Sequence, residues 1–263
     1  MEKDKENKAM YLDELFGLRG KVAVVTGGGR GIGQTVAIGM AKAGAEIVIL
    51  SRSGASETVS KIEFVGGKAY DIKTDVTIEA SVDAAIIEIL ERSGKIDILF
   101  NNAGICMHQS TLEAAIAEFR EVIDTNLTGQ FIVARAVGKA MIDKGIKGSI
   151  INMASMSGSI VNVPQWQCSY NASKAGVIHM TRSLAAEWAE YGIRVNSLSP
   201  GYIGTPMSAD TPIELRKAWM PLIPLHRMGE PEELIPPVLY LACDASGYTT
   251  GSDVVVDGAY SCL

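Results

Sequence analysis

Tyr170 and Lys174 stand four positions apart in a segment with a strongly helical pattern, Tyr170-Asn171-Ala172-Ser173-Lys174. Side chains at i and i+4 share one face of a helix, so a phenol and an ammonium there can reach the same bound ligand. A free tyrosine, with a pKa of about 10, is a poor base at neutral pH. Because a nearby ammonium favours the phenolate, we expect the pKa of Tyr170 to be lowered. The pair predicts an acid/base centre in which Tyr170 exchanges the proton.

A glycine-rich turn follows the first apolar run of the chain. Glycines let the backbone approach a pyrophosphate closely, and the amides at the start of the next helix face the anion with the positive end of the helix dipole. The spacing is GxxxGxG rather than GxGxxG, but the position between a strand and a helix supports a dinucleotide site. The residues predicted to bind there are Gly27, Gly29, Arg30, Gly31, Ile32 and Gly33.

The end of the second apolar run bears on which dinucleotide is bound. An NAD site usually has Asp or Glu about 20 residues beyond the glycines, and this chain has Ser51 and Arg52 there instead. A carboxylate would repel a 2′-phosphate, whereas a guanidinium can pair with one. Arg30 in the glycine turn adds a second positive charge. We therefore expect NADP(H) as the cofactor; in the alternative, NAD(H) binds and both arginines are merely solvated.

Short apolar runs alternate with amphipathic segments along the chain, which is typical of an α/β fold with a doubly wound parallel sheet. The seven runs predicted as strands are Val22–Thr26, Glu46–Ser51, Lys68–Ile72, Ile96–Asn101, Ser149–Ala154, Arg194–Ser199 and Asp253–Val256. Most are apolar on both faces, as strands between two helix layers must be. The predicted helices are Ile32–Ala43, Ile78–Glu91, Glu118–Lys144, Tyr170–Glu190 and Pro231–Cys243.

One long irregular segment, residues 201–227, interrupts this alternation. It contains four prolines and lies between a predicted strand and a predicted helix. Irregular segments of this length are often functional, so we predict a lid over a substrate; the alternative is a surface excursion without a role. No linker is evident, and we expect a lead-in at residues 1–17 followed by one domain at 18–263.

The composition limits the classes of partner. A net charge of −6 argues against nucleic acid, because phosphate backbones favour a basic surface. The four cysteines are scattered, with no cysteine–histidine cluster of metal-ligand spacing, so we expect free thiols and no metal. No stretch is apolar over the ~20 residues that a membrane span needs. Residues 1–8 lack the apolar run of a signal peptide, and we expect a cytoplasmic protein without a membrane anchor.

Several motifs accompany the tyrosine and lysine. In chain order they are TGGGRGIG at 26–33, Asp75 in TDVT, NNAG at 101–104, Asn126 in DTNLTG, Ser155 in NMASMSG, and Pro200-Gly201. Together they resemble the short-chain dehydrogenase/reductase family along nearly the whole chain after its N-terminal head. The resemblance implies a single-domain Rossmann fold with a seven-stranded parallel sheet. It also implies an oxidoreductase that transfers a hydride between a nicotinamide and a carbonyl/alcohol pair.

The resemblance assigns roles to four residues. Tyr170 matches the acid/base that protonates the carbonyl oxygen, and Ser155 matches the hydroxyl that orients this oxygen. Lys174 resembles the residue that lowers the tyrosine pKa and holds the nicotinamide ribose, and Asn126 the residue that supports a water in the proton relay. Further residues resemble cofactor contacts of the family: Asp75, Val76, Asn102, Ala103, Gly104, Pro200, Gly201, Ile203 and Thr205.

Two serines compete for the role of the catalytic hydroxyl. Ser155 lies fifteen residues before Tyr170, whereas the commoner spacing in the family is about two shorter and fits Ser157. We favour Ser155 because it directly follows a predicted strand and because SMSG aligns best with the Ser-x-x-Gly of the family. Substitution of each by alanine distinguishes them.

The substrate is the least specific prediction. Residues 162–165, 222–225 and 257–260 resemble members of the family that act on polyols and ketoses, of the mannitol dehydrogenase or sorbose reductase type. Candidate substrate residues are Ser157, Gln165, Trp166 and Met207. A hydroxysteroid dehydrogenase or 3-oxoacyl reductase is the alternative enzyme, and a dinucleotide-binding sensor without catalysis is the alternative of another class. The resemblance also implies a homotetramer, in which the segments Glu118–Lys144 and Tyr170–Glu190 pack against symmetry mates.

Overall fold

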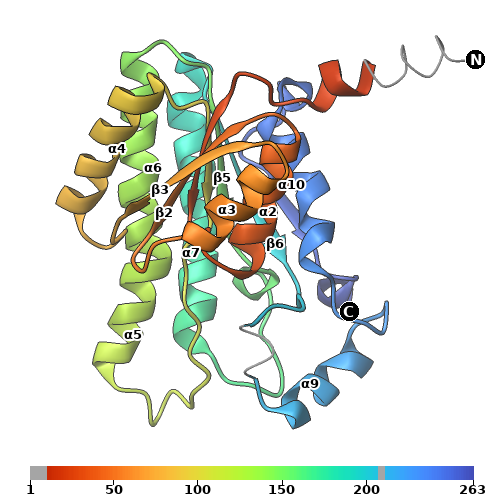
Figure 1. The fold of residues 1–263 in the computed structure, drawn as a ribbon. Coiled ribbons are helices and arrows are strands. Elements are labelled where there is room, and N and C mark those ends of the chain that lie inside the picture. Colours follow the sequence, from red (N-terminus) through yellow and green to blue (C-terminus); the bar gives the residue numbers. More distant parts are fainter. Residues whose placement is uncertain (1–10, 207–210) are drawn as a thin grey trace, which may run out of the picture.

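Seven strands form one sheet in which every neighbouring pair is parallel (Figure 1). The computed structural model describes residues 11–206 and 211–263. The strands are β1 (Val22–Thr26), β2 (Glu46–Ser51), β3 (Lys68–Lys73), β4 (Ile98–Asn101), β5 (Ser149–Met153), β6 (Arg194–Pro200) and β7 (Asp253–Val256). Their order, β3-β2-β1-β4-β5-β6-β7, reverses direction between β1 and β4. In open parallel sheets, ligands bind at the carboxyl ends of the strands near such a switch point.

Helices cover both faces of this sheet (Figure 1). They are α2 (Gly31–Lys42), α3 (Ser56–Phe64), α4 (Glu79–Ser93), α5 (Ile116–Ile123), α6 (Gly129–Asp143), α7 (Cys168–Trp188), α9 (Ile213–Trp219) and α10 (Ile235–Ala242). Residues of α2 and α10 pack on one face, and residues of α4, α6 and α7 pack on the other. This arrangement confirms the predicted doubly wound α/β fold.

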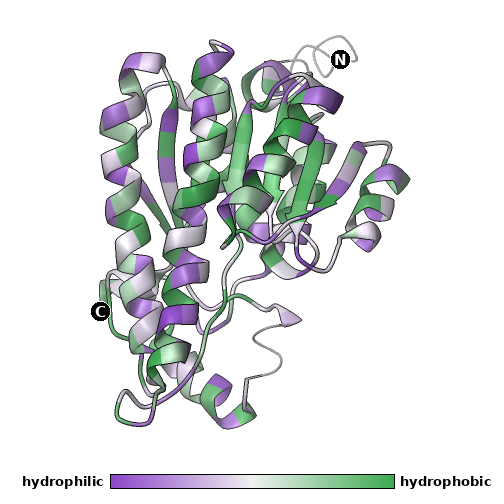
Figure 2. Cartoon of the chain, turned by 90° about the vertical axis from the view of Figure 1, so that its left-hand side faces the viewer, coloured by the Kyte–Doolittle hydropathy of each residue, from purple (hydrophilic) through white to green (hydrophobic). Residues whose placement is uncertain are grey.

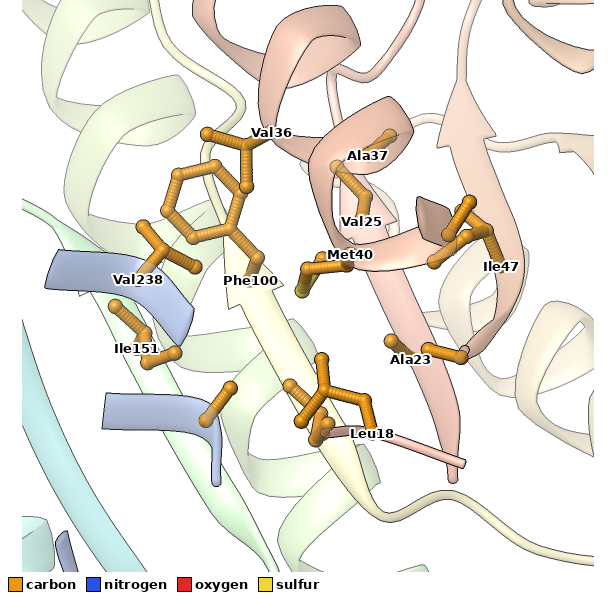
Figure 3. Packing of buried hydrophobic residues seen from close by; sticks show 14 of the residues in the cluster. Leu18, Ala23, Val25, Val36, Ala37, Met40, Ile47, Phe100, Ile151 and Val238 are labelled. Carbon is orange, nitrogen blue, oxygen red and sulfur yellow. The ribbon is translucent and has the colours of Figure 1, made fainter. Parts of the chain in front are cut away.

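The core between the sheet and α2/α10 is built from branched and aromatic side chains. Phe100 of β4, Met40 of α2 and Val238 of α10 are fully buried and belong to one cluster (Figure 3). Burial of a side chain of this size stabilises the fold by about 1.5–3 kcal/mol. Such packing fixes the strands, and therefore the loops at their ends, relative to one another.

Hydropathy separates the central strands from the edges of the sheet. Most strands are green in Figure 2, whereas the helices carry purple residues on their outer faces. The central strands β1, β4 and β5 are buried at every position, as the apolar runs predicted. The edge strands β3 and β7 are only half-buried, because each has a neighbour on one side alone.

Three local features differ from the sequence predictions. The helix predicted over Glu118–Lys144 is interrupted by a π-helix at Asp124–Thr128, which separates α5 from α6. α3 was missed, because it is short and only Thr58 and Ile62 of its residues are buried. The segment at 201–227 contains a helix, α9, and a 3₁₀ turn at Met220–Leu222 among its described residues.

Within residues 11–206 and 211–263, no helix combines the length and the apolar character that crossing a membrane requires.

Candidate active site

The predicted site residues lie at the carboxyl edge of the sheet. The glycine turn follows β1, Ser51 ends β2, Asp75 follows β3, and Asn102 follows β4. Ser155 follows β5, and Pro200 ends β6. Because all of these strands are parallel, their carboxyl ends meet at one edge. The sheet therefore brings together motifs that are spread over about 180 positions of the sequence.

Tyr170 and Lys174 lie on the first turns of α7 and face the same side. The Lys174 ammonium lies 5.5 Å from the centre of the Tyr170 ring. Lys174 is almost fully buried and donates a hydrogen bond to the Met153 carbonyl oxygen at 2.7 Å. This carbonyl also accepts from Gln130 Nε2 at 3.0 Å. The Met153 carbonyl at the end of β5 thus fixes the position of the Lys174 ammonium.

Burial dominates the proton affinity of both groups. It raises the pKa of Tyr170, and the negative charge of a Cys106 thiolate raises it further, whereas a hydrogen bond with Ser155 lowers it. Burial also lowers the pKa of Lys174 to about 8, partly opposed by Cys106. The lowering of the Tyr170 pKa expected from Lys174 is not found in the chain without a cofactor; the positive charge of an oxidised nicotinamide would act in the same direction as Lys174. Removing both groups from water costs the phenolate and the ammonium more than their proximity offsets.

Ser155 and Ser157 occupy different environments. Ser155 precedes the short 3₁₀ turn Met156–Gly158, and its Oγ accepts a hydrogen bond from the Ser157 backbone N–H at 3.2 Å. Its hydroxyl is also close enough to Tyr170 to lower the pKa of the phenol by hydrogen bonding. The Ser157 Oγ instead accepts from Gln167 Nε2 at 3.2 Å. Ser155 is thus the serine whose side chain contacts the tyrosine, which supports its predicted role.

Asn126 lies inside the π-helix and is fully buried. Its Oδ1 accepts from the Ile105 N–H at 2.8 Å, and its Nδ2 donates to the Ile105 carbonyl oxygen at 2.8 Å. The same Nδ2 donates to Ser173 Oγ at 3.1 Å, which joins this segment to α7. π-Turns are often found at functional sites. Here the π-helix aligns Asn126 with both the β4 loop and the catalytic helix.

The glycine turn has the close packing that a phosphate cradle needs. Gly27 adopts a left-handed φ of 66°, and a Cβ there would lie 3.0 Å from the Ala103 Cα. A Cβ on Gly33 would overlap the Gly27 carbonyl oxygen and lie 2.6 Å from Asn102 Nδ2. Thr26 Oγ1 accepts from the Ala103 N–H at 2.9 Å, which ties the β1 and β4 loops together. Any larger side chain would close this space.

The end of β2 carries a buried hydroxyl without a partner among the described residues. Ser51 Oγ is buried and, among residues 11–206 and 211–263, has no hydrogen-bond partner. A buried hydroxyl normally has one, so this oxygen is placed to receive a ligand group. Arg30 lies in the glycine turn and Arg52 directly follows β2, and both side chains are exposed. The pKa of Asp75 is lowered mainly by hydrogen bonds from Thr77 and also by the charge of Arg52.

The segment after β6 approaches the glycine turn. A Cβ on Gly31 would lie 3.7 Å from the Thr205 Cβ and 4.0 Å from Pro206 Cδ. Ile203 is buried, and the Gly204 N–H donates to the Gly229 carbonyl oxygen at 2.8 Å. Residues 203–206 therefore lie beside the start of α2, next to the predicted cofactor site.

The predicted substrate residues have different surroundings. Ser157 and Gln165 are buried and hydrogen-bonded within the protein, whereas Trp166 is 58% exposed. Gln165 contacts Tyr202 and Trp219 rather than the catalytic tyrosine. Met207 lies outside the described residues.

Two residues near the centre were not predicted. Cys106 interacts electrostatically with both Tyr170 and Lys174, and burial raises its own pKa to about 12. Gln167 is buried at the start of α7, and its amide nitrogen lies 2.9–3.2 Å from acceptors of Ser157, Asn162 and Asn171. Neither residue belongs to a spaced motif. Only their positions in the sequence could have indicated them: Cys106 comes shortly after NNAG, and Gln167 comes shortly before Tyr170.

Comparisons with known proteins agree over most of the chain. A family model described as enoyl-(acyl carrier protein) reductase matches residues 27–261. The sorbose reductase of Candida albicans is 43% identical over 95% of this chain and 90% of its own length. The NADP-dependent mannitol dehydrogenase of Alternaria alternata is 41% identical over 96% and 97%. A crystal structure of a short-chain type dehydrogenase/reductase from Mycobacterium marinum superposes with a TM-score of 0.90, at 45% identity over 95% and 98% of the two chains.

Proposed function

Because this chain belongs to the short-chain dehydrogenase/reductase family, we propose that it interconverts a ketose and the corresponding polyol with NADP(H). Relatives that are 41–43% identical are named a sorbose reductase and a mannitol dehydrogenase. The observation that carries the proposal is the contact of Ser155 with Tyr170 beside the buried Lys174. This contact lies at the carboxyl edge of the sheet, the same edge at which the glycine turn follows β1.

Each of these residues has a defined task in the proposed reduction. When bound, NADPH supplies the hydride that the carbonyl carbon accepts. Tyr170 gives its proton to the carbonyl oxygen as the alcohol forms, and Ser155 hydrogen-bonds this oxygen and orients it. Lys174 brings a positive charge to the tyrosine and to the ribose side of the site, and Asn126 holds the backbone of Ile105. Oxidation of the polyol uses the same groups in reverse.

Tyr170→Phe tests the proposed chemistry. The phenylalanine keeps the ring but removes the proton donor, so kcat is expected to fall by about 10²–10⁴ while NADPH still binds. Activity is followed as consumption of NADPH, and binding as quenching of protein fluorescence. If the variant binds NADPH but reduces the sugar at the wild-type rate, Tyr170 is not the acid.

The preference for NADP(H) is supported by the groups at the end of β2. Ser51 Oγ and the Arg52 and Arg30 guanidinium groups are suited to a 2′-phosphate, and no carboxylate follows Ser51 directly. Arg52→Ala is expected to raise the KM for NADPH about tenfold or more while the KM for NADH changes little. An equal effect on both cofactors would contradict a role for Arg52 in phosphate recognition.

A panel of carbonyl compounds tests the substrate class. Fructose, sorbose and xylulose are compared with steroid ketones and 3-oxoacyl thioesters, each with NADPH. The names of the relatives, a sorbose reductase and a mannitol dehydrogenase, support a polar substrate, whereas the apolar cluster of Met156, Ile223 and Tyr260 supports the alternative of a steroid or acyl substrate. Higher kcat/KM for ketoses is the expected result. A protein that binds NADPH but reduces no compound of the panel would favour the sensor alternative.

The cellular setting belongs to the same proposal. We expect the enzyme to act in the cytoplasm, as its scattered cysteines suggested, and as a homotetramer, as the family resemblance suggested. Exposed apolar residues on α5 and α6 support self-association.

A further inference from the structure

Trp219 connects the segment after β6 to the rest of the molecule. It is the residue of α9 that is buried, at 3% exposure, while the other described positions of this helix are open or half-buried. Its indole N–H donates to Gln165 Oε1 at 2.9 Å. An indole N–H is a donor only, so once buried it depends on such an acceptor. Gln165 therefore determines whether Trp219 can remain in this position.

The Gln165 amide binds both partners of a stacked aromatic pair. Its Nε2 donates to the Tyr202 hydroxyl at 2.7 Å, while its Oε1 accepts from Trp219. The rings of Tyr202 and Trp219 are stacked, with centres 4.0 Å apart and planes 7° apart. Tyr260 packs edge-on against Tyr202, at 5.4 Å. One amide thus joins α9, the loop before α7 and the segment after β6.

Hydrogen bonds continue from this amide toward the catalytic serine. The Tyr202 hydroxyl also accepts from Asn162 Nδ2 at 3.2 Å, and Asn162 Oδ1 accepts from Gln167 Nε2 at 3.0 Å. Gln167 Nε2 also donates to Ser157 Oγ at 3.2 Å, and the Ser157 N–H donates to Ser155 Oγ. These residues are all less than a tenth exposed, with the exception of Tyr202. The position of α9 is therefore linked to the serine beside Tyr170.

An apolar cluster places the turn that follows α9 next to the loop that carries Ser155. Met156, which follows Ser155 directly, is buried against Ile223 and Tyr260, with Met220 and Tyr202 around them. The acceptor atom of Gln165 and one of its two N–H protons are already used within the protein. A substrate that accepted from the same N–H, or donated to the same oxygen, would compete with these bonds.

We propose that Gln165 is a positioning residue that holds α9 beside the loop of Ser155 through Trp219 and Tyr202, and so sets the affinity for the sugar. This role rests on the proposed function of the site. It replaces the sequence prediction that Gln165 contacts the substrate directly. Loss of the amide leaves the buried Trp219 N–H without an acceptor, which favours displacement of α9.

Kinetics of two single variants and their combination test this proposal. Gln165→Leu keeps the side-chain size, and Trp219→Phe keeps an aromatic ring but removes the N–H. Each is expected to raise the KM for the best ketose about tenfold, while kcat and the KM for NADPH change less than about twofold. In the Trp219→Phe background, Gln165→Leu is expected to add less than about threefold, because the shared hydrogen bond is already lost.

A matched control separates this role from general destabilisation. Gln109→Leu removes a glutamine side chain on the neighbouring loop, where Nε2 donates to the Glu113 carbonyl oxygen at 3.2 Å. This variant is expected to keep the wild-type KM. Independent, multiplying effects of Gln165→Leu and Trp219→Phe would overturn the proposal, as would an unchanged KM in either single variant.

Limited trypsin digestion gives a readout that needs no substrate. Lys217 on α9 and Arg227 beyond it are exposed and lie within the segment that Gln165 holds. Gln165→Leu is expected to be cut there about tenfold faster than the wild type and Gln109→Leu, as mapped by peptide masses, because cleavage requires local opening. Equal cleavage rates would overturn the proposal even if no ketose is reduced. Faster cleavage without any ketose turnover would retain the role of Gln165 and reject only the proposed function.

Discussion

Lys174 is an ammonium with only 2% of its surface exposed, and burial lowers its pKa from 10.5 to about 8. Below about pH 8 the lysine is protonated in both the folded and the unfolded chain, and the cost of burying the cation is present in full. Between about pH 8 and 10 the unfolded chain binds more protons than the folded chain. The free energy of unfolding should therefore rise with pH over this range, by up to about 3 kcal/mol.

Lys174→Met isolates this effect. The variant removes the charge and leaves the Met153 carbonyl with its hydrogen bond from Gln130. We expect it to unfold at higher urea than the wild type at pH 7, with a difference that shrinks toward pH 10. Urea titrations at several pH values measure the difference between the two proteins, so that other titrating groups cancel. A difference that does not depend on pH would show that Lys174 is not a buried cation.

The two serines of the catalytic loop give a second prediction at this scale. Ser155→Ala removes the hydroxyl that contacts Tyr170, and kcat is expected to fall by about 10²-fold or more. Ser157→Ala keeps the backbone N–H that donates to residue 155, because only its side chain bonds Gln167. Its kcat should stay within about tenfold of the wild type. The reverse order of the two effects would assign the catalytic hydroxyl to Ser157.

Much of the candidate site could be predicted from spacing, but its electrostatics could not. The i, i+4 spacing of Tyr170 and Lys174 is fixed by helix geometry, so their shared side was foreseeable. The direction of the Tyr170 pKa shift was not, because it depends on burial and on Cys106, which only the folded structure brings near. The hydrogen bond between Gln165 and Trp219 could not be predicted from spacing either. Trp219 lies 54 positions away from Gln165, in a segment with no regular pattern.

At the scale of elements, the strands were predicted better than the helices. β1, β2 and β7 match their predicted bounds, because apolar runs bounded by polar turns are strong signals for buried strands. The π-helix between α5 and α6 was not predicted, since such turns are rare and occur inside longer helical segments. It forms where Asn126 bonds the Ile105 backbone, which is a tertiary contact.

Arg194 shows how one strand residue secures a helix end. Its guanidinium donates to the Leu241 carbonyl oxygen at 2.9 Å, to the Cys243 carbonyl oxygen at 3.0 Å and to Ser246 Oγ at 2.6 Å. These groups lie at and beyond the C-terminus of α10, where carbonyls lack helical partners. Arg194→Ala should therefore lower the free energy of unfolding by about 2–4 kcal/mol.

Urea denaturation checks this value, and Lys139→Ala serves as the reference. Lys139 forms an exposed i, i+4 ion pair with Asp143, and such pairs contribute about 0.3–0.5 kcal/mol. If both variants lose the same small amount, Arg194 does not stabilise the end of α10.

At the scale of the whole molecule, apolar side chains remain on the outside of α5 and α6. Ile116 is 67% exposed, Phe119 39% and Phe131 43%. Sedimentation is expected to give four times the chain mass of 28.0 kDa, and Phe131→Glu is expected to shift the protein to smaller species because it places a charge in the contact. A stable wild-type monomer at micromolar concentration would refute the tetramer.

Among the described residues, six turns lead from a helix into the next strand. Each contains a glycine with a positive φ, at Gly44, Gly66, Gly94, Gly145, Gly192 and Gly251. These turns lie at the amino ends of the strands, so the sheet separates them from every candidate site residue. A Cβ atom added at Gly66, Gly94 or Gly145 would meet no atom within 4 Å, so these turns lie in open space. A reporter domain fused into residues 144–146, or new termini opened there by circular permutation, should consequently leave turnover intact.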